Sequence, residues 1–101
     1  MNNNDLNELN LMNSLYDLYG ELLTPKQQKV FESYYFYNLS LSEIAENLEV
    51  SKAAVLDNLE HSKENLIKFE NSIHLFEKIS KIERMKIDED IKNKVLEELK
   101  K

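Results

Sequence analysis

The apolar residues of this chain recur with the spacing of α-helices. From Leu6 to Leu23, leucine, methionine and tyrosine side chains return every three or four positions, which predicts a mostly buried amphipathic helix. Gly20 lies inside this pattern. A glycine in a helix interior costs about 1 kcal/mol relative to alanine, so Gly20 indicates either close packing or an early end of the helix.

The residues that follow predict a second helix from Pro25 to about Asn38. Thr24 can cap its free amides, Pro25 suits the first turn, and Gln27 can complete a capping box. Asparagine tolerates the left-handed backbone found at helix ends, which places the end near Asn38. The side chains expected to point inward are Val30, Phe31, Tyr34 and Tyr35.

Residues 41–62 carry the pattern of a helix-turn-helix. Ser40 and Glu43 form a second capping box, which opens a short helix of barely two turns with Ile44, Ala45 and Leu48 on one face. A helix-turn-helix needs a small residue where its helices cross, an apolar residue in the turn, a polar cap and then an apolar anchor. The chain supplies these in order as Ala45, Val50, Ser51 and Val55. Glu49 stands where glycine is usual, so the turn either relaxes or holds Glu49 in a left-handed conformation at some cost.

A long helix, or two in series, is expected after Ser51, because no proline or glycine interrupts the rest of the chain. The expected kink is at Asn71 and Ser72. A near-heptad apolar stripe runs along this segment at Leu59, Leu66, Phe69, Ile73 and Phe76. The stripe either packs on the first helix or forms a self-association surface, and the small size of the chain favours packing. A last, loosely held helix is expected over 87–99, with an apolar side of Ile91, Val95 and Leu99.

The composition also favours an all-α fold. The 101 residues are 42% hydrophobic and 32% charged, with one glycine, one proline and no cysteine, which suits helices with charged surfaces and disfavours β-hairpins. We expect a single helical domain over 1–101. Within it, the helix-turn-helix covers about 41–62, and a C-terminal helical extension, either one long helix or a helix pair, covers about 63–101.

The sequence lacks the features of exported, membrane and metal-binding proteins. No basic cluster precedes an apolar run at its start, and no apolar stretch approaches about 20 residues, so we expect a soluble cytoplasmic protein without membrane contact. With no cysteine and only two histidines, no metal or other cofactor is expected. Asp57 and His61 lie one helical turn apart, but no nucleophile or glycine-rich loop accompanies them. A surface hydrogen bond or ion pair is therefore favoured over catalysis, and no catalytic residue is assigned.

Charge is the main argument about the ligand. The net charge is −6, and residues 1–50 hold two lysines against eight acids. From 41 to 62 the only cation is Lys52, against five acids, which gives a net charge of −4. Affinity for a phosphate backbone comes mostly from clustered lysine and arginine, so this balance counts against tight DNA binding. The candidate nucleic-acid-binding residues are Ser51, Lys52, Ala53, Leu56, Asn58 and His61.

The aromatic run at residues 34–37 offers a candidate contact with a partner. A helix cannot bury four consecutive side chains on one face, so Tyr34 and Tyr35 are expected in the core and Phe36 and Tyr37 near the surface. An exposed Phe36 would be the best candidate for a binding hot spot. Stacking of this run on single-stranded bases is the alternative. Together with the near-heptad stripe, the candidate partner-binding residues are Phe36, Tyr37, Leu66, Phe69, Ile73 and Phe76.

Several segments of the chain resemble a known family. They are LLTPKQ at 22–27, the tyrosine pair at 34–35, LSLSEIAE at 39–46, VSKAAVLDNL at 50–59 and HLFEK at 74–78. In order and spacing, from about Leu9 to Ile82, they resemble the YlxM family of bacterial helix-turn-helix proteins, with a more distant likeness to region 4 of sigma factors. The resemblance implies a cytoplasmic regulator or adaptor linked to the signal recognition particle (SRP) pathway, which would bind the protein or RNA of that particle.

The chain departs from this family in its charge, and three hypotheses remain open. Family members look more basic in the second helix of the motif, which puts DNA binding by this chain in doubt. The favoured hypothesis is a non-enzymatic adaptor or regulator of the SRP pathway. The alternative is a transcriptional regulator that reads DNA, weakly, through residues 51–61. The third is a structural homodimer that pairs through its long fourth helix.

Overall fold

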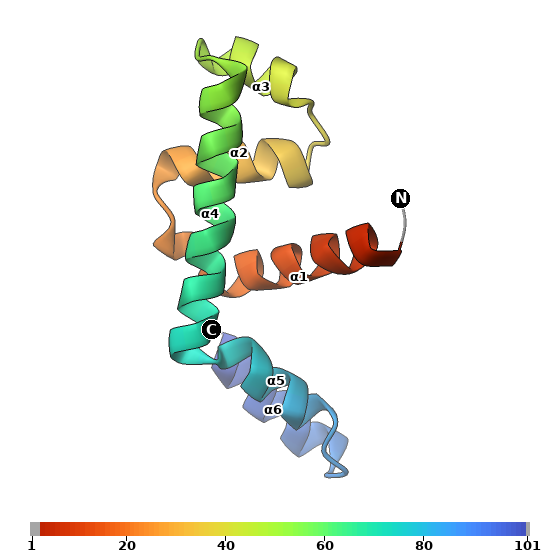
Figure 1. The fold of residues 1–101 in the computed structure, drawn as a ribbon. Coiled ribbons are helices and arrows are strands. Elements are labelled where there is room, and N and C mark those ends of the chain that lie inside the picture. Colours follow the sequence, from red (N-terminus) through yellow and green to blue (C-terminus); the bar gives the residue numbers. More distant parts are fainter. Residues whose placement is uncertain (1–2, 101) are drawn as a thin grey trace.

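Every regular element of the described chain is a helix, as the sequence predicts (Figure 1). The computed structural model describes residues 3–100, with side chains from residue 6 onward. The elements are α1 (Asn3–Tyr19), the 3-10 turn η1 (Gly20–Leu22), α2 (Pro25–Tyr35), α3 (Leu41–Leu48), α4 (Lys52–Ile73), α5 (Leu75–Glu83) and α6 (Glu89–Lys100). Among these residues, no helix is both long and apolar enough to span a membrane.

The predicted helix starts are confirmed by their capping hydrogen bonds. The Gln27 amide donates to the Thr24 hydroxyl at 3.2 Å, and the Thr24 amide donates back to the Gln27 side chain at 3.1 Å. Ser40 and Glu43 form the same reciprocal pair before α3. Ser51 caps α4 by accepting from the Ala54 amide at 3.0 Å. Local sequence therefore fixes where these three helices begin.

Gly20 both marks the end of the helix and allows close packing, the two possibilities that the sequence left open. The α-helix α1 ends at Tyr19, and Gly20 begins the 3-10 turn. A Cβ atom added at Gly20 would lie 3.0 Å from ring carbons of Tyr16, which is closer than van der Waals contact allows. The absence of a side chain thus lets the Tyr16 ring lie against the backbone at the end of α1.

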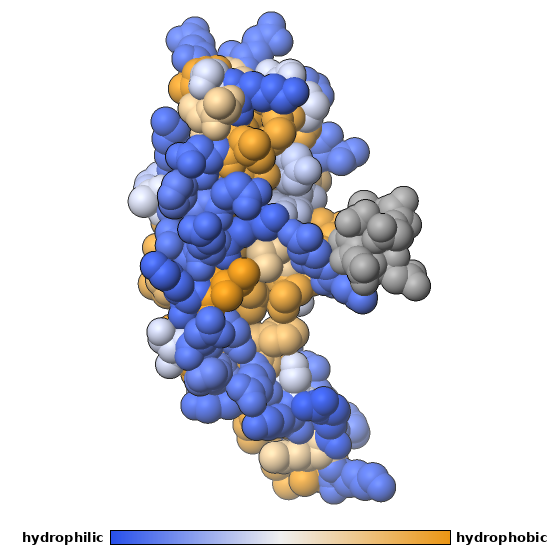
Figure 2. Space-filling view, in the orientation of Figure 1, coloured by the Kyte–Doolittle hydropathy of each residue, from blue (hydrophilic) through white to orange (hydrophobic). Residues whose placement is uncertain are grey.

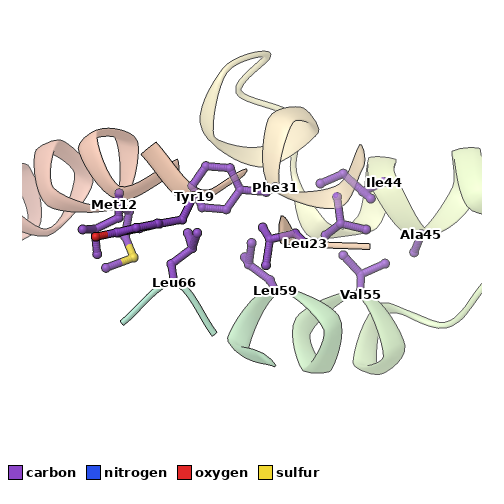
Figure 3. Close-up of a cluster of buried hydrophobic side chains, with 11 residues drawn as sticks. Met12, Tyr19, Leu23, Phe31, Ile44, Ala45, Val55, Leu59 and Leu66 are labelled. Carbon is purple, nitrogen blue, oxygen red and sulfur yellow. The ribbon is translucent and has the colours of Figure 1, made fainter. Parts of the chain in front are cut away.

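The core forms around α4, because α1, α2 and α3 all pack on this helix (Figure 1). The Phe31 ring of α2 is fully buried, and its centroid lies 4.4 Å from the ring centroids of both Tyr16 and Tyr35. Tyr34, which the sequence places in the core, is 38% exposed, so that prediction is wrong for Tyr34. Figure 3 shows the buried cluster, which consists of Met12, Leu15, Tyr19, Leu23, Val30, Phe31, Ile44, Ala45, Val55, Leu59 and Leu66.

The near-heptad stripe of α4 and α5 belongs mainly to this core. Leu59 and Leu66 are buried, and Phe69 and Phe76 are half-buried against the core cluster. The prediction that Leu66 binds a partner is therefore corrected, because its side chain is fully buried in the core cluster. Of the five stripe residues only Ile73, at 45% exposed, remains open to a partner.

The break between α4 and α5 falls at His74, so the kink predicted at Asn71 and Ser72 is wrong. Both of those residues stay helical, and His74 adopts a left-handed conformation with φ 59°. The Glu70 carbonyl accepts the last bond of α4, from the His74 amide at 2.7 Å. The Glu70 carboxylate accepts the first free amides of α5, from Phe76 at 3.0 Å and Glu77 at 3.1 Å. One residue thus ends one helix and caps the next.

Tyr19 of α1 completes this junction. Its hydroxyl donates to Glu70 at 2.6 Å and accepts from the Leu75 amide at 3.0 Å. Burial and the hydrogen bond to Glu70 raise the pKa of Tyr19, so the hydroxyl stays protonated and remains a donor. The position of the break is therefore set by a tertiary contact with α1 and not by helix propensity at Asn71 and Ser72.

The helices α5 and α6 form a hairpin that extends away from the core. The radius of gyration is 16.0 Å, against about 13 Å for a compact domain of this length. The expected apolar side of α6 is only partly correct, because Ile91 and Val95 are 58% and 40% exposed. Lys92 is buried instead: its stem lies against α5, and its ammonium donates to the Glu83 carbonyl at 3.2 Å.

Replacing Glu49 with glycine is expected to stabilise the protein. Glu49 ends α3 with φ 56° and ψ 43°, a left-handed conformation that glycine adopts without strain. We expect Glu49→Gly to raise the free energy of unfolding by about 1 kcal/mol, measured by urea denaturation. Glu46→Gly, inside the same helix, serves as the matched control and should lower it by about 1 kcal/mol. Equal destabilisation by both changes would contradict this account of the turn.

Removing the Glu70 carboxylate should loosen the start of α5. In Glu70→Ala, the amides of Phe76 and Glu77 lose their acceptors, and we expect their hydrogen exchange to accelerate at least tenfold, on the scale of about 1.5 kcal/mol for a charged hydrogen bond. Glu64→Ala, an exposed change on the same helix, is the control and should leave these amides protected. Unchanged protection in Glu70→Ala would show that packing alone holds the junction.

Candidate binding surface of the helix-turn-helix

The helices α3 and α4 meet through small and β-branched side chains. Ile44, Ala45 and Val55 are buried between them, and Ala45 leaves room for the close crossing that the sequence predicts. The Val50 amide donates to the Ala45 carbonyl at 3.0 Å, which closes the turn. Glu49 takes the left-handed conformation, so the turn does not relax to avoid it. This packing holds the amino-terminal end of α4 at the molecular surface.

The first residues of α4 are exposed, but they offer few groups to a nucleic acid. Ser51, Lys52 and Ala53 are all exposed. The Ser51 hydroxyl already accepts from the Ala54 amide, which occupies part of its hydrogen-bonding capacity. Lys52 is therefore the one cation that the turn and the first two turns of α4 present to a ligand within the described residues.

Two other predicted base-reading residues, Leu56 and Asn58, lie one to two turns further along α4. Leu56 is 45% exposed, lies one helical turn beyond Lys52 and lines a groove. Asn58 is half-buried, and its side-chain oxygen is buried without a hydrogen-bond partner. The prediction of a base contact for Asn58 is thus corrected for its side-chain oxygen, which is buried and cannot reach a base. The structure brings Ser51, Lys52, Ala53 and Leu56 together at the exposed amino-terminal end of α4, and Asn58 is partly withdrawn from them.

His61 is exposed and is held by its own helix. Its Nδ1 lies 2.8 Å from the Asp57 carbonyl and 3.5 Å from an Asp57 carboxylate oxygen. The hydrogen bond to that carbonyl, followed by the charge of Asp57, raises the pKa of His61 above its ordinary 6.5. The pair is the surface hydrogen bond that the sequence analysis favours. Within the described residues, no group of three or more acidic or histidine side chains is arranged to hold a metal ion.

A groove beside α4 was not predicted. Its volume is about 860 Å³, and it lies between α1, the end of α2, the start of α3 and α4. Sequence reasoning missed it because its walls come from four separate segments. The one available signal was that Tyr34 and Leu56 are large apolar residues, and both were assigned to other roles. The groove is lined by Glu8, Leu9, Tyr34, Tyr35, Asn38, Leu39, Ser40, Leu41, Glu43, Leu56, Leu59, Glu60 and Lys63.

An ion pair links two walls of this groove. The Lys63 ammonium of α4 lies 2.7 Å from the Glu8 carboxylate of α1 and 3.9 Å from Glu60. Burial alone would lower the pKa of Lys63, but the hydrogen bond to Glu8 and the nearby negative groups outweigh it and raise the pKa. Burial raises the pKa of Tyr35, which lies beside Lys63. Lys63 is therefore charged, and its ammonium is already paired with the Glu8 carboxylate.

The aromatic run ends at the surface. Phe36 is 46% exposed and Tyr37 is 73% exposed, as the sequence predicts. The inner part of the Phe36 ring still packs edge-on against Tyr16, with 5.4 Å between centroids, and against Phe31, at 6.0 Å. Phe36 is thus anchored as well as exposed, the combination expected of a contact residue.

A histidine titration tests the arrangement at His61. By NMR, we expect the His61 ring to titrate above 6.5 in the wild type and closer to 6.5 in Asp57→Asn. The pKa is raised in the folded state, so the stabilisation is fully present below the unfolded pKa and is lost as the pH rises through the folded pKa. The stability difference between wild type and His61→Ala should therefore shrink as the pH rises through that interval. A His61 pKa at or below 6.5 would contradict the contact.

Comparison with known proteins gives the family of this chain. Residues 6–101 match the model of the family UPF0122, described as "Putative helix-turn-helix protein, YlxM / p13 like". A UPF0122 protein of Oceanobacillus iheyensis is 40% identical over 87 residues, covering 86% of this chain and 81% of that protein. UPF0122 proteins of a Geobacillus and an Exiguobacterium species are each 42% identical, over 85% and 79% of this chain and 76% and 75% of their own lengths. The chain therefore belongs to the UPF0122 family of YlxM/p13-like helix-turn-helix proteins.

Proposed function

We propose that this protein is a cytoplasmic, non-enzymatic helix-turn-helix adaptor of the SRP pathway that works mainly through protein contacts. The observation that carries the proposal is the charge of the motif. Residues 41–62 hold Lys52 as their only lysine or arginine, against Glu43, Glu46, Glu49, Asp57 and Glu60. All five acids are exposed, so they face any ligand that approaches the motif.

Such a surface is poorly suited to a phosphate backbone. Each phosphate contact normally uses a lysine, an arginine or a free backbone amide, and binding grows with the number of counterions released. One lysine among five carboxylates offers few phosphate contacts and would release few counterions. The fold constrains the shape of the motif and not its ligand, so the same helices can serve as a protein-binding surface.

Family membership supports the pathway assigned here. The chain belongs to a family described as YlxM / p13 like. The resemblance of its sequence to YlxM proteins implies a link to the SRP, with the SRP protein or RNA as partner. The resemblance to region 4 of sigma factors is part of the same proposal. We also propose that residues 1–101 act as one domain, with the helix-turn-helix at about 41–62 and the remainder, about 63–101, as an extension.

DNA binding is the second candidate, and one observation favours it. Lys52 is exposed at the amino-terminal end of α4, where the recognition helix of a helix-turn-helix contacts bases, and Ser51 and Ala53 beside it are exposed as well. A homodimer through the long fourth helix has less support, because Ile73 is the one member of the near-heptad stripe that is exposed.

A binding titration separates these functions. The purified chain is titrated against the SRP protein, the SRP RNA and random duplex DNA, each at about 50 mM and about 200 mM salt. Binding to an SRP component that persists at the higher salt, with little DNA binding, is the expected result. Tight duplex binding with a steep salt slope would reverse the ranking in favour of a DNA-binding regulator.

Any affinity for duplex DNA should depend on Lys52. Because Lys52 is the sole cation of the motif, we expect Lys52→Ala to abolish the weak duplex binding measured by fluorescence anisotropy at low salt. Lys94→Ala, an exposed change on α6, is the matched control and should leave the duplex binding unchanged. Tight duplex binding that survives Lys52→Ala would contradict the proposal.

A further inference from the structure

The groove beside α4 exposes two large apolar side chains that are not part of the buried core. Tyr34 on α2 and Leu56 on α4, which are 38% and 45% exposed, both line it, together with the buried Leu59. Figure 2 shows hydrophobic surface beside α4, at the level of α3, bordered by hydrophilic side chains. The groove volume of about 860 Å³ lies within the range of about 300–1,000 Å³ that is usual for ligand pockets. The groove can therefore take up apolar side chains from a partner.

The rim of the groove is acidic. It carries the carboxylates of Glu8, Glu43 and Glu60 against the single ammonium of Lys63. Lys63 is neutralised by Glu8 at 2.7 Å, which leaves Glu43 and Glu60 as the excess charge. Hydrogen bonds from the Ser40 backbone and side chain lower the pKa of Glu43, so this carboxylate stays ionised well below neutral pH. Charges of one sign around a concave apolar surface concentrate their field on whatever enters it.

Charge complementarity selects the occupant. A nucleic acid or an acidic peptide would bring further negative charge to a rim that is already negative. A second copy of this chain would do the same, since its net charge is −6. An amphipathic segment suits the groove better. Its apolar anchors would contact the apolar floor, and its flanking lysine or arginine side chains would pair with the acidic rim, as when a helix binds in a groove.

We propose that this groove binds a short cationic amphipathic segment of a protein partner. The apolar anchors of that segment would contact Tyr34 and Leu56, and its lysine or arginine side chains would pair with Glu43 and Glu60. This inference rests on the proposed adaptor function and specifies the chemistry of the partner at its binding surface.

A designed peptide tests the proposal on the full chain. The probe is a fluorescein-labelled helical peptide of leucine and lysine, about 14 residues and roughly 21 Å long, with leucine at every third or fourth position. A leucine–glutamate peptide of the same pattern is its control. Measured by fluorescence anisotropy, the leucine–lysine peptide should bind and the leucine–glutamate peptide should not. Equal binding of the two peptides would overturn the proposal.

Two exposed substitutions locate the binding. Leu56→Ser and Glu60→Gln should each weaken the leucine–lysine peptide about tenfold, the scale of a truncated hot-spot side chain. Ile91→Ser on α6 and Glu64→Gln on the outer face of α4 are the matched controls, and they should leave the affinity unchanged. Circular dichroism checks that each variant keeps its helices. An unchanged affinity in Leu56→Ser, or equal losses in the controls, would overturn the proposal.

Two further measurements separate the groove from the alternatives. If sedimentation shows a dimer that Leu56→Ser dissociates, a second copy occupies the groove and the proposal fails. The SRP protein is titrated against wild type and Leu56→Ser in parallel with the peptide. Equal SRP protein binding by both would leave the adaptor function standing and remove the groove from it. Groove-dependent peptide binding without SRP protein binding would keep the groove site and reject the SRP assignment.

Discussion

The fold depends on covering one apolar face of α4. This helix runs from Lys52 to Ile73 and presents Val55, Leu59 and Leu66 to the interior, where α1, α2 and α3 pack on it. Each of these side chains gains roughly 1.5–3 kcal/mol from burial, which no helix of this chain could obtain alone. Because the inward face of α4 is fully used, only its outward face and its flanks are free for a ligand. The inward face of α4 therefore determines the fold, and its outward face and flanks provide the binding surface.

Much of the fold could be predicted because the contacts that determine it join residues close together in the sequence. The capping residues Thr24, Ser40 and Ser51 mark helix starts through contacts within three positions, and such contacts can be read directly from sequence. The break at His74 could not, because Glu70 and Tyr19 make it through a contact between distant segments. The burial of Lys92 could not be predicted either. A lysine side chain is expected at the surface, yet the stem of Lys92 is buried where α5 and α6 meet.

The candidate site was less predictable, because it depends on which side of α4 each residue faces. Sequence reasoning grouped Leu56 and Asn58 with Lys52, but Leu56, one turn beyond Lys52, also lines the groove, and the side-chain oxygen of Asn58 is buried. The groove itself joins Glu8 to Lys63, a pairing that requires the tertiary structure. The acidic balance of the motif, by contrast, was evident from the sequence and remains the main argument against tight DNA binding.

The central claim is that this helix-turn-helix contacts a protein through the acidic, apolar flank of α4 and not a nucleic acid through its amino-terminal end. The most direct measurement is an NMR amide map of the isotope-labelled chain with unlabelled SRP protein added, and separately with SRP RNA. The account predicts that the protein shifts the amides of Tyr34 and Leu56 while Lys52 and Ala53 stay in place. Shifts centred on Lys52 and Ala53, produced by the RNA and not by the protein, would contradict it.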